Sequence, residues 1–222
     1  MTLLLSQLSL NLQHRDVRRD LGNAYDLHRT LARTFADGPE AGVKPFLWRL
    51  ESGRPMETSK VLVQSSTEPH WDDLPAGYLS GLEERTWSPE TVLQAGRAVR
   101  LRVLANPTVN RVPHPRDGEE PQGGPARGQR KRLGLWREDE QLEWLQRQGL
   151  RLGLTDLQAA VSRSERWRCR RQGGPVTVAV AQFDGQAVIA DPDALAAGIR
   201  TGIGHARMLG LGLVSVVPLR VA

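Results

Sequence analysis

Strand-like and helix-like segments follow one another along these 222 residues in an order that few folds accommodate. Apolar and polar residues alternate over 8–12, which predicts a half-buried strand. Apolar residues at helical spacing over 24–35 predict a helix, and Asn23 before them is a residue type that caps helix N-termini. Two further strands are predicted over 43–50 and 60–66. The first half therefore has the order strand, helix, strand, strand.

The second half repeats this kind of order. We predict a strand at 98–105, a helix at 138–149 and two strands over 176–190 that are joined by an Asp184-Gly185 turn. A helix at 191–202 and a closing strand at 213–219 follow. Two βαββαβ units side by side satisfy both the order and the length. We therefore expect an N-terminal domain over 1–94 and a C-terminal domain over 95–222.

Other segments carry weaker signals. The stretch between the first strand and the first helix is expected to form a polar bend, and residues 69–88 to form a helix or a loop. Residues 111–132 are rich in proline, glycine and charge, which predicts a loop with a basic end. Gly149 is expected to end the helix that begins at residue 138.

The charge balance favours a polyanionic partner. Lys plus Arg exceed Asp plus Glu by 30 to 25, and 27 of the 30 basic residues are arginine. The planar guanidinium binds phosphate through two hydrogen bonds and stacks on bases, so this bias suits nucleic acid better than simple solubility. A GC-rich genome, which favours arginine codons, explains the same bias and stays open as an alternative.

Cysteine usage and the apolar segments indicate the compartment. The single cysteine, Cys169, excludes an internal disulfide framework and a cysteine-based zinc site, and it fits a reducing cytoplasm. Residues 1–12 lack the basic flank of a signal peptide. The apolar run 208–219 is too short and too rich in glycine to cross a bilayer. We expect a cytoplasmic protein with no membrane partner.

Five glycines lie within the sixteen residues 198–213. Their spacing fits neither a dinucleotide-binding fingerprint nor a P-loop. A glycine-rich loop that runs from a helix into the last strand can bring backbone amides close to a polyanion. A helix C-cap with a tight connection to the strand explains the same glycines. The loop residues that are candidates for contact with a polyanion are Gly202, Gly204, His205, Arg207, Gly210 and Gly212.

Tyr25 and His28 are three residues apart on the predicted first helix and so lie on one side of it. His28 falls at the edge of the apolar face, and Arg29 and Arg33 continue around the same flank. This spacing places an imidazole where core meets solvent, with a phenol and two guanidiniums nearby. A histidine that merely packs against the core is the alternative.

Two further clusters of basic residues stand out. If 162–172 is a strand, the side chains of Arg166, Arg168 and Arg170 point the same way and form a basic ridge that ends at a Gly-Gly turn. Such a ridge suits the groove of a duplex or stem-loop. Solvated charged surface that opposes sheet aggregation is the alternative. The remaining basic candidates in the two clusters are Arg163, Arg171, Arg127, Arg130, Lys131 and Arg132.

Signatures of metal or nucleophilic enzymes are absent from the sequence. There is no HExxH, no paired aspartate cluster, no GxSxG and no Cys/His pair with ligand spacing. We expect no metal and no cofactor. Any chemistry that this chain performs would therefore have to proceed without a metal or a protein nucleophile.

Several motifs occur together in a characteristic order. They are Tyr25-x-x-His28-Arg29, RLRVLANPTVNR at 100–111, WLQRQG at 144–149, FDGQAVIAD at 183–191 and GIRTGIGHARMLGLGLVSV at 198–216. From the first to the last, the chain resembles the CRISPR precursor-RNA-processing endoribonucleases of the type I-E system, the CasE group.

The resemblance implies an α+β fold of two tandem ferredoxin-like, RRM-related domains. It also implies a metal-independent endoribonuclease, a hydrolase of RNA phosphodiester bonds. The cut at the base of the CRISPR repeat hairpin would leave a 2′,3′-cyclic phosphate and a 5′-hydroxyl. The protein would then stay on the guide RNA as a subunit of the Cascade surveillance complex, in antiviral defence.

The resemblance also assigns residues. It implies that His28 and Tyr25 are catalytic, that Arg29 and Arg33 bind RNA beside them, and that 162–172 is an arginine-rich hairpin entering the RNA major groove. Family members often carry lysine in the glycine loop, where this chain has other basic side chains. A non-catalytic, RRM-like subunit that binds the RNA hairpin is the alternative function.

Overall fold

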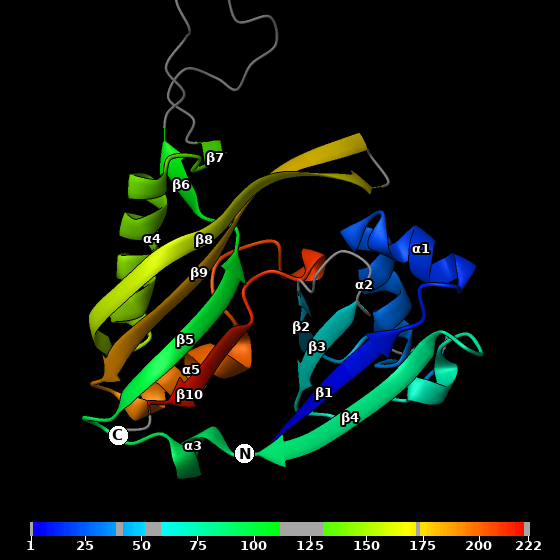
Figure 1. Ribbon diagram of the computed structural model, residues 1–222, viewed down its shortest axis with the longest axis horizontal. Helices are drawn as coiled ribbons and strands as arrows, with labels where there is room; N and C mark the ends of the chain where they lie inside the picture. The colour runs from blue at the N-terminus through cyan, green and yellow to red at the C-terminus, as the bar shows by residue number, and fades with distance from the viewer. Residues whose placement is uncertain (1, 39–41, 52–58, 112–130, 172–173, 220–222) are drawn as a thin grey trace, which may run out of the picture.

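Each half of the chain builds one four-stranded antiparallel sheet in the computed structural model, which describes residues 2–38, 42–51, 59–111, 131–171 and 174–219 (Figure 1). The N-terminal elements are β1 (Leu3–Leu10), α1 (Arg15–Leu21), α2 (Ala24–Arg33), β2 (Phe46–Glu51), β3 (Lys60–Ser65), the 3-10 turn η1 (Trp71–Asp73), β4 (Leu79–Trp87) and α3 (Pro89–Val92). The C-terminal elements are β5 (Ala98–Ala105), β6 (Thr108–Arg111), β7 (Lys131–Gly134), α4 (Glu138–Arg151), β8 (Leu154–Arg171), β9 (Gly174–Ile189), α5 (Pro192–Thr201), η2 (Arg207–Leu209) and β10 (Val214–Pro218).

The two sheets have the same topology. Their strand orders are β2-β3-β1-β4 and β10-β5-β9-β8. In each four-stranded sheet, the strand that comes first along the chain lies between the third and the fourth, which is the ferredoxin-like arrangement, while β6 and β7 form a separate two-stranded sheet. The predicted α+β fold of two such units is therefore confirmed. The predicted boundary between residues 94 and 95 falls between α3 and β5 and stays a prediction.

Two N-terminal elements differ from the sequence-based expectation. The polar bend is in fact helix α1, whose N-cap His14 accepts a hydrogen bond from the Asp16 amide. The helix-or-loop region 69–88 ends in strand β4, whose residues 80–86 are all exposed. The usual second helix of the unit is reduced to η1 here. Because β4 has no buried face along most of its length, it shows no apolar alternation that could have predicted it.

Two predicted breaks in the C-terminal half are wrong. Strand β9 continues through Asp184 and Gly185 without a turn. A Cβ on Gly185 would lie 2.4 Å from the Gln158 carbonyl oxygen, so glycine permits the close approach of β8 at its bulge. Likewise α4 runs past Gly149, where a Cβ would lie 2.6 Å from the Leu157 side chain. Both glycines serve close packing rather than chain reversal.

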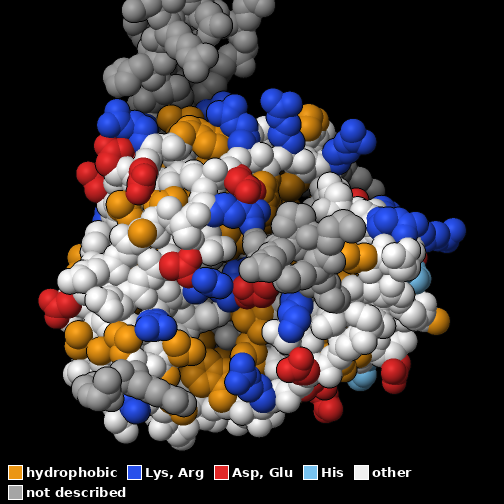
Figure 2. Space-filling view, in the orientation of Figure 1, with side chains coloured by type: hydrophobic (Ala, Val, Ile, Leu, Met, Phe, Trp, Pro, Cys, Tyr) orange, Lys and Arg blue, Asp and Glu red, His pale blue; other side chains and the backbone are white. Residues whose placement is uncertain are grey.

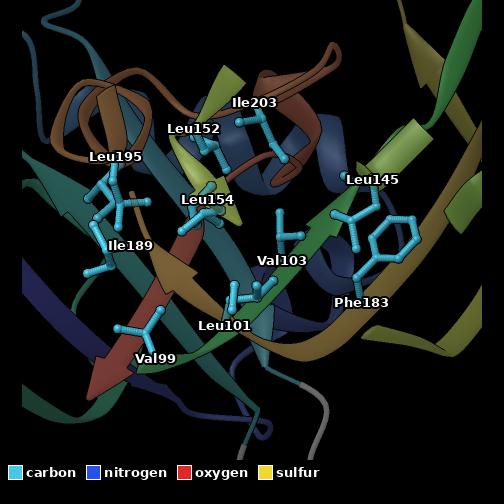
Figure 3. Packing of buried hydrophobic residues seen from close by; sticks show 14 of the residues in the cluster. Val99, Leu101, Val103, Leu145, Leu152, Leu154, Phe183, Ile189, Leu195 and Ile203 are labelled. Atoms are coloured by element: carbon cyan, nitrogen blue, oxygen red, sulfur yellow. The ribbon is translucent and has the colours of Figure 1, made fainter. Parts of the chain in front are cut away.

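The core of the C-terminal unit lies between its sheet and its two long helices (Figure 3). Val99, Leu101 and Val103 alternate along β5 toward this core, where Phe183 of β9 and Leu145 of α4 meet them. This alternation matches the prediction for β5. No helix in the described part of the chain is long and apolar enough to cross a membrane.

Hydrogen bonds join the two halves. The Arg49 guanidinium of β2 is buried, donates to the Leu213 carbonyl oxygen at 3.2 Å, and forms an ion pair with Glu51. The Gln64 side chain of β3 donates to the Ile199 carbonyl oxygen of α5 at 2.7 Å. Buried polar contacts of this kind fix the orientation of one unit on the other.

Candidate active site and nucleic-acid interface

His28 lies on α2, half-buried, between two aromatic residues of β2. The indole nitrogen of Trp48 donates to His28 Nδ1 at 3.3 Å, and the imidazole stacks on Phe46 with ring centroids 5.2 Å apart. Since Nδ1 accepts this hydrogen bond, the hydrogen-bond network assigns the proton of the neutral ring to Nε2. Burial lowers the pKa of His28 below its ordinary value of 6.5. The neutral ring is therefore the form present at pH 7.

The glycine-rich loop of the C-terminal half packs against Trp48. Gly210 has φ +77°, and a Cβ there would lie 2.6 Å from the Trp48 ring. The turn η2, just before Gly210, contacts both α2 and β2. The loop thus packs directly on the tryptophan that orients His28.

Gly210→Ala is expected to destabilise the protein by about 2–5 kcal/mol, because a left-handed backbone conformation costs about 1–2 kcal/mol for alanine and overpacking adds about 1–3 kcal/mol. Urea unfolding measures this loss. Gly96→Ala is the matched control, since Gly96 also has φ +77° but nothing lies within 4 Å of its Cβ position. Equal losses in the two variants would contradict the proposed contact with Trp48.

The structure gives three predicted RNA-binding glycines another role. Gly202, Gly210 and Gly212 are buried and have positive φ, and their amides donate to carbonyl oxygens within the protein. The Gly212 amide donates to Leu104 at 2.7 Å, and the Gly212 carbonyl accepts from the Ile203 amide at 2.9 Å. Their amides are therefore not available to a polyanion, which corrects that part of the prediction.

The side chains of the loop remain candidates for RNA contact. His205 and Arg207 are exposed. Gly204, which lies between α5 and His205 in the chain, is half-buried. Burial and the nearby charges of Arg132 and Arg207 lower the pKa of His205. Arg207 lines a cavity of about 350 Å³ together with Phe46, the stacking partner of His28.

Tyr25 occupies the turn of α2 before His28 but has different neighbours. It packs, half-buried, against a buried apolar cluster that includes Cys169 and Leu209. His28 instead contacts Phe46 and Trp48 of β2. The structure therefore brings the two predicted catalytic side chains to the same helix but not into one set of contacts.

The two arginines predicted beside His28 are exposed on α2. The Arg29 guanidinium is 61% exposed and lies 3.9 Å from the Asp26 carboxylate, and Arg33 is exposed as well. A surface ion pair of this length contributes little, so Arg29 can exchange it for a phosphate.

The arginine-rich segment is a strand, as predicted. It forms the end of β8, which pairs with β9 up to Arg171 and Gly174. Arg166, Arg168 and Arg170 are exposed, while the intervening Trp167 and Cys169 are half-buried and buried. This alternation confirms the basic ridge. Figure 2 shows Lys and Arg side chains gathered along the upper edge of the molecule, over this hairpin.

The other members of the two basic clusters divide into three groups. Lys131 and Arg132 are exposed on β7. The Arg163 guanidinium is half-buried and forms an ion pair with Glu165, with Nε and Oε1 2.6 Å apart. Arg127 and Arg130 lie outside the described residues, and of Arg171 only the backbone is described.

Sequence reasoning missed how the hairpin is attached to α2. Asn23 precedes α2, but its side chain makes no capping hydrogen bond. Instead its Nδ2 donates to the Arg170 carbonyl at 3.1 Å, and its Oδ1 accepts from the Arg170 amide at 3.3 Å. The basic ridge is therefore tied to the start of the helix that carries Tyr25 and His28.

Comparisons with known proteins agree with one another along nearly the whole chain. The model of a family described as CRISPR associated protein matches residues 3–218. The chain is 34% identical to the CRISPR-associated endoribonuclease Cse3 of Thermus thermophilus, covering 96% of this chain and 99% of that protein. It is 29% identical to the CRISPR system Cascade subunit CasE of Escherichia coli, covering 90% and 94% of the two chains.

Solved structures show the same likeness. One is Thermus thermophilus Cse3 bound to an RNA representing a pre-cleavage complex, with a TM-score of 0.82, 32% identity and coverage of 98% of this chain and 100% of that chain. Another is a chain of a CRISPR RNA-guided surveillance complex, with a TM-score of 0.70, 28% identity and coverage of 97% and 100%.

Proposed function

The chain belongs to the CRISPR-associated protein family described above, and we propose that it is an endoribonuclease that cleaves CRISPR precursor RNA at the base of the repeat hairpin. The observation that carries the proposal is the setting of His28, a half-buried imidazole on a helix to which an arginine ridge is tied. The similar RNA-bound Cse3 structure supports RNA as the substrate.

The proposed reaction uses the RNA's own 2′-hydroxyl. Its oxygen attacks the adjacent phosphorus, the bond from phosphorus to the 5′-oxygen breaks, and the products are a 2′,3′-cyclic phosphate and a 5′-hydroxyl. One proton leaves the 2′-oxygen and one reaches the 5′-oxygen. The protein needs to position the strand, assist the proton movements and stabilise the charge that builds up on the phosphate.

We assign the central role to the neutral ring of His28. With Nδ1 accepting from Trp48, the Nε2–H group is the donor that can meet an oxygen of the scissile phosphate. A neutral imidazole with a lowered pKa serves other enzymes as such a donor. Tyr25 is proposed as a second donor or positioning group. A preorganised hydrogen-bond donor to the charge that develops on the phosphate contributes about 10²- to 10³-fold.

Binding of the hairpin is proposed to depend on exposed cationic side chains. The described cationic candidates are Arg29, Arg33, Lys131, Arg132, Arg166, Arg168, Arg170 and Arg207, and the exposed imidazole of His205 is a further candidate for RNA contact. Guanidinium groups on a strand hairpin can follow the phosphates of a stem. We further propose that the protein retains the cut RNA in the cytoplasm as a subunit of a surveillance complex, as the similarity to CasE and to a surveillance-complex chain suggests.

A repeat RNA with a single 2′-deoxy nucleotide at the cleavage site tests the reaction. The unmodified RNA should be cut in the presence of EDTA, with a cyclic phosphate on the upstream product, whereas the 2′-deoxy RNA should bind equally well and remain intact. Gel analysis of end-labelled RNA measures both. If neither RNA is cut in any buffer but both bind, the protein is an RNA-binding subunit without nuclease activity.

A further inference from the structure

A cavity of about 370 Å³ lies between Tyr25 of α2, the strands β7 to β9 and the η2 turn. Its walls include Asn106, which follows β5, Trp136, which follows β7, and the cationic or titratable side chains of Arg132 and His205. The mechanism proposed above uses neither Asn106 nor Trp136. The volume is within the range of about 300–1,000 Å³ that small-molecule sites occupy.

Asn106 is the first reason to expect a ligand there. Its side chain is only 9% exposed, and its Oδ1 atom is buried without a hydrogen-bond partner among the residues that the structure describes. Buried polar atoms are paired in the great majority of cases, so an unpaired one needs an explanation. A side-chain amide offers a donor and an acceptor side by side, which matches the edge of a nucleobase.

Trp136 is the second reason. This large apolar side chain is 43% exposed, and the Arg166 guanidinium lies 4.4 Å from the centre of its ring. Arg166 belongs to the basic ridge proposed to bind the RNA backbone. An exposed indole next to cationic side chains is a usual platform for unpaired bases, because every base offers a π-face for stacking.

We propose that this cavity binds one unpaired nucleobase of the RNA, with Asn106 hydrogen-bonded to the base edge and Trp136 in contact with its face. The inference rests on the proposed function and specifies its substrate further. The base must be unpaired, since the deep, narrow major groove of an RNA duplex hides base edges from side chains. Tyr25, which is proposed as a second donor or positioning group in the reaction, lines the same cavity.

An abasic scan tests the proposal. Synthetic repeat RNAs, from the CRISPR array of the organism that encodes this chain, each carry one abasic nucleotide around the hairpin base. Their affinities are measured for the unchanged protein and for Asn106→Ala. For the unchanged protein, one position should lose about 5- to 150-fold in affinity. For Asn106→Ala, intact RNA should bind more weakly, and the abasic change at that position should cost much less.

Variants at three positions separate this role from a structural one. Asn106→Ala removes a buried unpaired carbonyl, so its thermal midpoint should be no lower than that of the unchanged protein. Trp136→Ala should weaken binding and Trp136→Phe should restore most of it. Asn110→Ala, the same substitution in exposed β6 and outside this cavity, should leave the sensitivity to the abasic position unchanged.

The outcomes are distinct. The base pocket is overturned if, at every position, the loss of RNA affinity caused by Asn106→Ala simply adds to the loss caused by the abasic nucleotide. It is also overturned if Asn106→Ala lowers the thermal midpoint of the protein while its affinity for RNA is unchanged. If these results occur while the unchanged protein still cleaves the repeat, only the pocket fails and the proposed function stands. If the unchanged protein does not bind repeat RNA at all, both proposals fall.

Discussion

The His28→Ala variant is expected to cleave repeat RNA about 10²- to 10³-fold more slowly while binding it nearly as tightly as the unchanged protein. Removal of the ring takes away the only imidazole that the structure places against the β2 aromatics, among the residues it describes. It leaves the arginine ridge untouched. Single-turnover cleavage gives the rate, and filter binding gives the affinity.

His70→Ala is the matched control, because that imidazole is 57% exposed and, within the described part of the chain, its ion-pair partner is the Asp37 carboxylate at 3.7 Å. Its cleavage rate should be unchanged. A His28→Ala variant with the normal rate would remove the catalytic role proposed for this residue.

The pH dependence of cleavage tests which form of His28 is active. Since burial lowers the pKa of His28 below 6.5, the neutral fraction rises with pH and the neutral ring predominates at pH 7. The single-turnover rate should therefore rise with pH and level off, with a midpoint below 6.5. In Trp48→Phe the ring loses the donor to Nδ1 that favours its neutral form, so the midpoint should move to higher pH. A rate that instead falls as pH rises from 5 to 7 would assign catalysis to the imidazolium.

The double variant Arg168→Ala/Arg170→Ala is expected to lose about 10²-fold in affinity for the repeat hairpin. Two charge-assisted hydrogen bonds to phosphate, each contributing about 1.5 kcal/mol or more, account for that loss. The plot of log affinity against log salt concentration should also flatten, by about 0.9 for each phosphate contact removed on a duplex. Binding measured from low to high salt gives both quantities.

Arg85→Ala/Arg97→Ala removes the same charge from exposed positions on β4 and before β5, outside the hairpin. This control should keep nearly all of the affinity and the slope. Equal losses in the two double variants would mean that net charge, and not the ridge, governs binding.

Local periodicity was sufficient to predict much of this fold. The alternation over 8–12 marked the end of β1, alternation also marked β5, and helical spacing marked α2. The helix predicted from residue 191 is α5, whose N-cap Asp191 accepts from the amides of Asp193 and Ala194. These signals persist in the sequence because each element buries one face. β4 escaped prediction for the opposite reason, since residues 80–86 are exposed on both faces.

The candidate site was predictable only in part. The order of residue types placed Tyr25, His28 and the arginine ridge on the right elements, because helix and strand periods translate directly into faces. The partners of those residues come from elsewhere in the chain. Trp48 looked like any apolar strand residue, and Asn23 looked like an ordinary helix cap.

The glycines show most clearly which features depend on tertiary packing and could not be predicted from the sequence. A glycine in the sequence indicates that the backbone bends sharply or packs closely against a neighbouring group, but it does not indicate which group that is. The loop was expected to approach RNA, whereas Gly210 approaches Trp48 and Gly212 approaches the Ile203 carbonyl. Which imidazole nitrogen carries the proton likewise depends on contacts between β2, α2 and the C-terminal loop. Residues far apart in the chain meet only after both units have folded, so no local pattern could reveal these contacts.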